Sequence, residues 1–246
     1  MKPTGITRVR NEELIRADTI RHYLQHCEHI ILYDDASTDN TWHAALAAGG
    51  DRITVIQGHK WRTDRTAEET RHRRLLLDRA RQRGAEWVLC FDADERLVGE
   101  LPHLHAASCS GYTFRLFDGY LTDARRQDYT RGPLEDLPRM WGPEYRDILM
   151  LFRADRALYH GLDRREPVIS GTTLRSGAMV KHYGKCLSVA HWEETCDYYA
   201  RYFPKLYRDK WLARKGKAIH TRSDFGRELR RWSILMTDHY SWHPLK

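Results

Sequence analysis

The sequence predicts an α/β fold with a mainly parallel sheet that helices flank. Two observations carry this prediction. Short apolar runs alternate with amphipathic segments of helical length over residues 6–98, and two of the runs end in carboxylate clusters, Asp34-Asp35 and Asp92-Ala93-Asp94-Glu95. Four or five apolar residues bounded by polar ones are typical of a parallel strand that is buried on both faces. The acidic residues should therefore lie at the carboxyl edge of the sheet, where open α/β folds bind ligands.

The first strand is expected at residues 6–9. Apolar side chains then recur at steps of three and four, which indicates an amphipathic helix. They are Leu14, Ala17, Ile20, Leu24 and Cys27. A second strand is expected at residues 30–33, and the polar run 37–40 offers N-cap residues for a helix at 42–48 that ends at Gly49-Gly50.

A third strand is expected at residues 53–56 and a fourth at 87–91, with a helix at about 66–83 between them. Repeated β-α units predict a parallel sheet with right-handed crossovers. The pattern is less regular afterwards. Short strand-like pieces lie at 111–117, 148–152 and 179–183, and the segment 131–143, which contains Pro and Gly, is either a lid or a poorly ordered loop.

The length of 246 residues suits one large α/β domain with an appendage. We expect a domain over residues 1–184 and a C-terminal helical extension over 185–246. No apolar stretch is long enough to span a membrane and no export signal is visible, which predicts a cytoplasmic protein. The five cysteines form no CxxC pair, which favours structural thiols over disulfides or a thiolate zinc site.

The extension holds most of the net charge of +7, because residues 185–246 contain 13 Lys and Arg against 7 Asp and Glu. Aromatic residues lie between these charges, a mixture that suits a peripheral contact with an anionic membrane surface, a nucleic acid or a phosphorylated acceptor. The alternative is a set of amphipathic helices whose aromatic side chains pack on the domain.

The two acidic clusters predict a nucleoside diphosphate site. Residues i and i+2 of an extended chain project to the same side, so Asp92 and Asp94 could converge on a hard cation such as Mn²⁺ or Mg²⁺ that neutralises the diphosphate. Asp34 and Asp35 would accept hydrogen bonds from ribose hydroxyls or a base N–H. Either cluster alone could instead be a helix cap or a solvated turn.

The order VRNEE, then HIILYDDASTDNT, then WVLCFDADE resembles the nucleotide-sugar-binding half of GT-A glycosyltransferases, which have a Rossmann-like sheet, and family 2 in particular. The resemblance covers residues 6–98 and implies that residues 99–184 form the acceptor half. It implies a nucleotide-sugar donor, UDP-sugar favoured, and a glycan, a lipid-linked or another hydroxyl acceptor. The implied base pocket contains Arg10, Asn11 and Glu12, the implied uridine site contains Asp34 and Asp35, and Asp92 and Asp94 hold the ribose and the metal.

The second half resembles the family less. An inverting transferase needs a carboxylate that takes the proton from the acceptor hydroxyl. Glu166 in RREPV is the first candidate for this base and Asp136 in PLEDLP the second, although Arg165 stands where relatives often have His. His182 could complete the metal sphere, as the resemblance implies. Arg71, His72 and Lys185 could balance the charge of the diphosphate.

Two other classes of function compete with this interpretation. A nucleic-acid-binding module, or a metal-dependent nuclease that uses Asp92 and Asp94, would explain the basic extension, but no nucleic-acid motif is visible. A HAD-type phosphatase also uses a DxD motif, but the motif here is central in the chain and is followed by Glu95.

Overall fold

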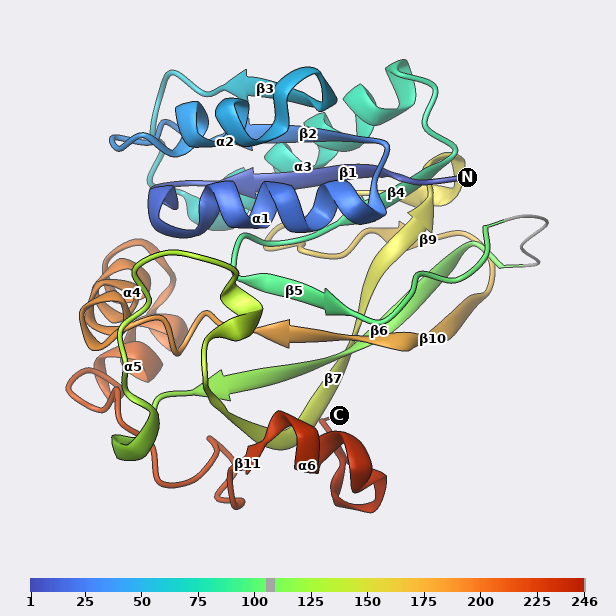
Figure 1. Ribbon diagram of the computed structural model, residues 1–246. Helices are drawn as coiled ribbons and strands as arrows, with labels where there is room; N and C mark the ends of the chain where they lie inside the picture. Colours follow the sequence, from blue (N-terminus) through green and yellow to red (C-terminus); the bar gives the residue numbers. More distant parts are fainter. Residues whose placement is uncertain (105–108, 246) are drawn as a thin grey trace. The chain divides into compact units, whose positions relative to one another are not determined.

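The computed structural model describes residues 1–104 and 109–245 (Figure 1). The chain divides into two compact units. The first contains Met1–Phe114 and Ile148–Ala178, and the second contains Arg115–Asp147 and Met179–Lys246. This division differs from the expected boundary between residues 184 and 185, because the C-terminal segment packs with the middle of the chain.

The first unit contains the predicted parallel sheet. Its strands are β1 (Thr4–Val9), β2 (His29–Asp34), β3 (Ile53–Gln57) and β4 (Trp87–Cys90), in the order β3-β2-β1-β4. β1 is parallel to both β2 and β4, and β2 is parallel to β3. The end of β7 (Met140–Arg153) then adds to β4 in the antiparallel direction. The prediction of an α/β fold with a mainly parallel sheet is confirmed for this unit.

Three helices cover this sheet: α1 (Glu13–His26), α2 (Thr41–Gly49) and α3 (Arg65–Gln82). Figure 1 shows α1 and α2 on one face and α3 on the other. The prediction that Leu14 begins the buried apolar face of α1 was wrong, because Leu14 is 46% exposed while Ile15 is fully buried. Polar residues complete the buried face, namely Arg16, Thr19 and His22.

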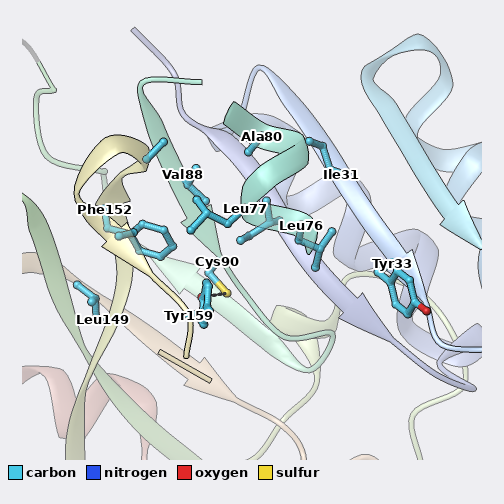
Figure 2. Close-up of a cluster of buried hydrophobic side chains, with 13 residues drawn as sticks. Ile31, Tyr33, Leu76, Leu77, Ala80, Val88, Cys90, Leu149, Phe152 and Tyr159 are labelled. Carbon is cyan, nitrogen blue, oxygen red and sulfur yellow. Dashed lines mark hydrogen bonds between the residues drawn. The ribbon is translucent and has the colours of Figure 1, made fainter. Parts of the chain in front are cut away.

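A cluster of buried apolar side chains holds α3 against β2 and β4 (Figure 2). Leu76 and Leu77 from α3 pack with Val88 of β4 and with Phe152 of β7. Burial of one such side chain contributes about 1.5–3 kcal/mol. This core fixes the carboxyl ends of β2 and β4, which are the ends that carry the acidic clusters.

The rest of the first unit follows the sheet. β5 (Glu95–Val98) begins at the last residue of the second acidic cluster. β8 (Ala157–Leu158) pairs with β9 (Val168–Ile169) in the antiparallel direction, so residues 159–167 form a loop between them. This loop carries Arg165 and Glu166. Two 3-10 turns, Gly50–Arg52 and Ala154–Arg156, complete the unit.

The second unit contains the parts of β7, β6 (Gly111–Tyr120) and β10 (Thr173–His182) that fall within residues 115–147 and 179–246; these strands are neighbours in that order. Its helices are α4 (Val189–Tyr202), α5 (Lys205–Leu212) and α6 (Trp232–Thr237), so helices do occur in the expected extension. The same segment also adds β11 (Arg230–Arg231) and β12 (His243–Pro244) to β7. Short 3-10 turns lie at Asp123–Arg125, Leu134–Asp136 and His239–Ser241.

The segment 131–143 contains the 3-10 turn Leu134–Asp136 and the first four residues of β7, and part of it is tightly packed. Leu134 is fully buried and Arg139 is 4% exposed. The Arg139 guanidinium donates to the carbonyl oxygens of Arg125, Gln127 and Cys186. These bonds anchor the segment within its own unit.

All five cysteines are free and buried, as expected of structural thiols. No helix in the described part of the chain is long and apolar enough to cross a bilayer.

Candidate active site

The predicted site lies at the carboxyl edge of β1, β2 and β4. β1 leads into Arg10, Asn11 and Glu12, while β2 ends at Asp34 and β4 is followed by Asp92. Parallel strands place these segments side by side, with Val9 opposite Asp34. The second acidic cluster is a turn, in which the Glu95 N–H donates to the Asp92 carbonyl oxygen at 3.3 Å. The expectation of an extended chain that aligns Asp92 with Asp94 was therefore wrong.

Two arginines neutralise Asp92. Its Oδ1 accepts from Arg73 at 2.8 Å and its Oδ2 from Arg165 at 3.0 Å. Arg165 also donates to both oxygens of Glu95, at 2.5 and 2.7 Å. Burial alone would raise the pKa of Asp92, but Arg73 and Arg165 hold it well below its usual range. Asp92 is therefore a carboxylate at neutral pH, and both of its oxygens are occupied.

Asp35 belongs to a second buried ion-pair network. It is 1% exposed, and its Oδ2 accepts from Arg8 at 3.0 Å and from Arg65. His72 Nε2 lies 3.8 Å from Oδ1. Burial lowers the pKa of His72 to about 4, so the ring is neutral at physiological pH. Asp35 thus stabilises the junction of β1, β2 and α3.

Asp34 differs from Asp35 because half of its carboxylate has no partner. It is 3% exposed, and Oδ2 accepts the Ser37 N–H at 3.1 Å. Oδ1 is buried and has no hydrogen bond to any described residue. A buried carboxylate oxygen without a donor is costly, on the order of 1–3 kcal/mol. Asp34 is thus prepared to accept a hydrogen bond from a ligand.

A tryptophan lies beside this carboxylate cluster. The Arg10 guanidinium stacks over the Trp61 ring at 3.6 Å, and the Arg65 guanidinium lies 3.9 Å from the same ring. Arg10 also donates to the backbone carbonyl of Asp35 at 2.7 Å. Asn11, at φ 51°, accepts the Thr38 N–H at 2.9 Å, which ties the end of β1 to the turn after β2.

Glu12 and Arg16 form an unusual pair at the start of α1. Burial and the negative charge of Asp94 raise the pKa of Glu12 to about 8. Arg16 is fully buried, none of its guanidinium nitrogens has a hydrogen-bond partner among the described residues, and burial lowers its pKa to about 10. Arg16 supplies a positive charge close to Glu12, Asp94 and Asp34.

Arg71 is the most accessible cation of the predicted set. Its side chain is 46% exposed and pairs with Glu68 at 2.6 Å. His72 and Arg73, the next residues of α3, are buried instead. The sequence interpretation did not identify Arg65 and Arg73 as site residues. The signal was present, since Arg65, Glu69 and Arg73 recur at steps of four and so share one face of α3.

The candidate bases lie in different units. Glu166 is half-buried in the first unit, and its Oε2 accepts the Leu149 N–H at 2.7 Å. Asp136 is exposed on a 3-10 turn of the second unit. His182 also belongs to the second unit, where its Nδ1 lies 2.6 Å from Asp118. The structure thus gathers the predicted nucleotide residues in one unit, whereas Asp136 and His182 lie outside that unit.

The side chains around Asp92 do not fit a divalent cation as they stand. Such an ion needs carboxylate oxygens that are free of other cations, but Arg73 and Arg165 occupy both oxygens of Asp92. Within residues 1–104 and 109–245, no group of three or more His, Cys, Asp or Glu side chains is arranged to hold a metal. A metal at Asp92 would have to displace at least one of these two guanidinium groups.

No family model and no curated protein matches the chain. A mycobacterial protein is similar at 16% identity over 48% of this chain and 41% of its own, with a TM-score of 0.31. A second similar structure is glucosyl-3-phosphoglycerate synthase from Mycobacterium tuberculosis in complex with Mn²⁺, UDP-glucose and phosphoglyceric acid. Its sequence is 16% identical over 49% of this chain and 44% of its own, with a TM-score of 0.28. HddC from Yersinia pseudotuberculosis is 8% identical over 79% of this chain and 98% of its own, with a TM-score of 0.41.

The chain spans less than half the length of the first two of these structures. TM-scores this low do not establish a shared fold, so the residues of the site carry the functional proposal. The resemblance of the motifs to GT-A glycosyltransferases of family 2 stays a prediction.

Proposed function

We propose that the chain is a GT-A glycosyltransferase that moves a sugar from a nucleoside diphosphate, with UDP favoured, to an acceptor hydroxyl. The free Oδ1 of Asp34 carries this proposal. It is buried at the carboxyl end of β2 and lacks a donor among the described residues. A ribose hydroxyl or a base N–H would satisfy it, which is the role of an acid at this place in nucleotide-binding α/β folds.

The surroundings of Asp34 suit a nucleoside. Trp61 and Arg10 supply a flat, cationic surface against which a base can stack. Asn11 holds the turn after β2 in place through Thr38. Arg71, an exposed cation of α3, is the candidate partner of the diphosphate.

Glu166 is the proposed general base, with inversion at the anomeric carbon. The acceptor oxygen forms a bond to that carbon as its proton passes to Glu166, and the bond from the carbon to the phosphate oxygen breaks. The nucleoside diphosphate leaves with the electron pair. The Leu149 N–H fixes one oxygen of Glu166, so the other can accept the proton. Mn²⁺ or Mg²⁺, if bound, would supply positive charge that stabilises the leaving diphosphate. The proposed reaction does not depend on such an ion, because Arg73 and Arg165 occupy the oxygens of Asp92.

Thermal stabilisation by nucleotides tests the proposal. UDP at about 100 times its dissociation constant should stabilise the protein by about 2.7 kcal/mol. Asp34→Asn keeps the shape of the side chain but loses the charge, and UDP should bind it at least about tenfold more weakly. Asp78→Asn is the matched control, because Asp78 is an exposed acid on α3 that pairs with Arg81.

Two results would contradict the proposal: no stabilisation by UDP, GDP or dTDP, or stabilisation by a short oligonucleotide without any nucleotide effect. The second result favours the nucleic-acid-binding alternative. If a nucleotide does bind, a screen of UDP-, GDP- and dTDP-sugars for hydrolysis and transfer identifies the donor.

A further inference from the structure

The second unit contains a cluster of charged side chains that the proposed reaction does not use. Lys185 lies at its centre, where its Nζ donates to Asp118 at 2.8 Å and to Asp224 at 2.7 Å. Arg214 also donates to Asp224, at 2.7 Å, and Arg146 lies 3.5 Å from Asp118. These residues come from β6, β7 and the loops after β10 and α5, and Figure 1 shows β6 and β10 both running toward α4 and α5.

Positive charge exceeds negative charge in this cluster. Lys210 of α5 comes four residues before Arg214, and because Ala213 continues the helical backbone the two side chains lie about one helical turn apart. Burial and the charges of Arg214, Lys185 and Arg146 lower the pKa of Lys210, against a smaller opposing effect of Asp224. The four cations Arg146, Lys185, Lys210 and Arg214 thus outnumber the two carboxylates, Asp118 and Asp224, by two. Lys210 has no ion-pair partner in the described part of the chain, and Arg146 has only the 3.5 Å contact. Like charges held this close repel one another unless an anion joins them.

Aromatic side chains flank this cluster, and solvent can reach one of its cations. Tyr120 lies 5.1 Å from Lys185 Nζ, and Trp211 lies 5.2 Å from the Arg214 guanidinium. Lys185 is 9% exposed, which lowers the dielectric constant around its charge. The Arg146 side chain is 43% exposed, so a ligand can reach it from solvent. Its guanidinium has five N–H donors in a planar fork that matches an oxyanion.

We propose that Arg146, Lys185, Lys210 and Arg214 form a binding site for a dianionic oxyanion, namely a phosphate monoester. The excess of two positive charges matches the charge of such a group, and the guanidinium groups of Arg146 and Arg214 match its geometry. Asp118 and Asp224 keep Lys185 and both arginines in place when the site is empty. In a transferase the phosphate belongs to the acceptor, and only this last assignment rests on the proposed function.

Titration of the full-length protein with inorganic phosphate, without nucleotide, tests the site. Calorimetry at constant ionic strength, with chloride as the competing anion, separates specific binding from general screening. Arg146→Gln/Lys210→Gln removes the two accessible cations and leaves the buried ones, so the variant should fold. We expect phosphate to bind this variant at least about tenfold more weakly than the wild type.

Lys205→Gln is the matched control, because Lys205 lies on the same helix as Lys210 and its side chain is 77% exposed. Its phosphate affinity should equal that of the wild type. Equal loss in the control and in the double variant, or no phosphate binding above the chloride background, would overturn the proposal. A sugar phosphate that binds more tightly than inorganic phosphate identifies the ligand as an acceptor, whereas equal binding identifies free phosphate. A failed nucleotide test with successful phosphate binding would leave this site standing and remove only the acceptor assignment.

Discussion

Arg165 holds two acidic residues of the candidate site, so its replacement should destabilise the protein strongly. Arg165→Met keeps the length of the side chain but removes its charge. Glu95, which is 2% exposed, then loses both bonds from Arg165, while its Oε2 still accepts the Asp92 N–H at 2.9 Å. Asp92 retains Arg73. Breaking a buried ion pair by removing one partner costs about 3–5 kcal/mol, and we expect the lower end because the Arg165 side chain is 25% exposed.

A loss of about 3 kcal/mol should lower the melting temperature by about 6–12 °C for a chain of this size. Calorimetry and urea unfolding measure it. Arg153→Met is the control, because Arg153 pairs with Glu86 and Asp155 at the surface, where such pairs contribute about 0–1 kcal/mol. The double change Arg165→Met/Glu95→Gln should recover part of the loss, since it also removes the buried negative charge that Arg165 paired with. Equal melting temperatures of the two single variants would refute this account of the site.

Three further predictions concern the same unit. The raised pKa of Glu12, about 8, means that the folded state keeps a proton that the unfolded state releases near pH 4.5, so stability should fall as pH rises from about 4.5 to 8. Glu12→Gln should abolish this slope in urea unfolding, and an unchanged slope would contradict the assignment. Glu166→Gln should keep nucleotide binding but reduce transfer by about 10²- to 10⁴-fold, with Asp136→Asn measured in parallel, and normal transfer would exclude Glu166 as the base. The Arg165→Met variant should bind Mn²⁺ more tightly than the wild type in paramagnetic resonance titrations, because the change frees one oxygen of Asp92. Tight Mn²⁺ binding by the wild type would show instead that a metal can displace the arginines from Asp92.

The buried face of α1 and the segment 131–143 show where sequence reasoning fails within the fold. Apolar periodicity placed Leu14 on the inner face, but the helix buries Arg16 and Thr19 there instead. A hydropathy pattern does not count polar residues as buried. The sequence of segment 131–143, which contains Pro and Gly, does not predict the hydrogen bonds of Arg139 that anchor it. The Arg139 guanidinium donates to backbone carbonyls of residues outside the segment, and no local pattern indicates such partners.

The sequence alone determined the alternation of strands and helices in the first unit, and with it the edge of the sheet where Asp34 and Asp92 lie. This was possible because strand period, helix period and turn residues are local properties of the chain. It also determined which residue types meet at that edge, since parallel strands end side by side.

Only the tertiary structure decided the state of those acids. Asp35 and Asp92 are neutralised by Arg65, Arg73 and Arg165, which lie 19 to 73 positions away along the chain. Asp34, the direct neighbour of Asp35, keeps one oxygen that no described residue hydrogen-bonds. Adjacent carboxylates are equivalent in a sequence, but the strand turns their side chains in opposite directions, and the charge and accessibility of each then depend on which distant side chains fold against it.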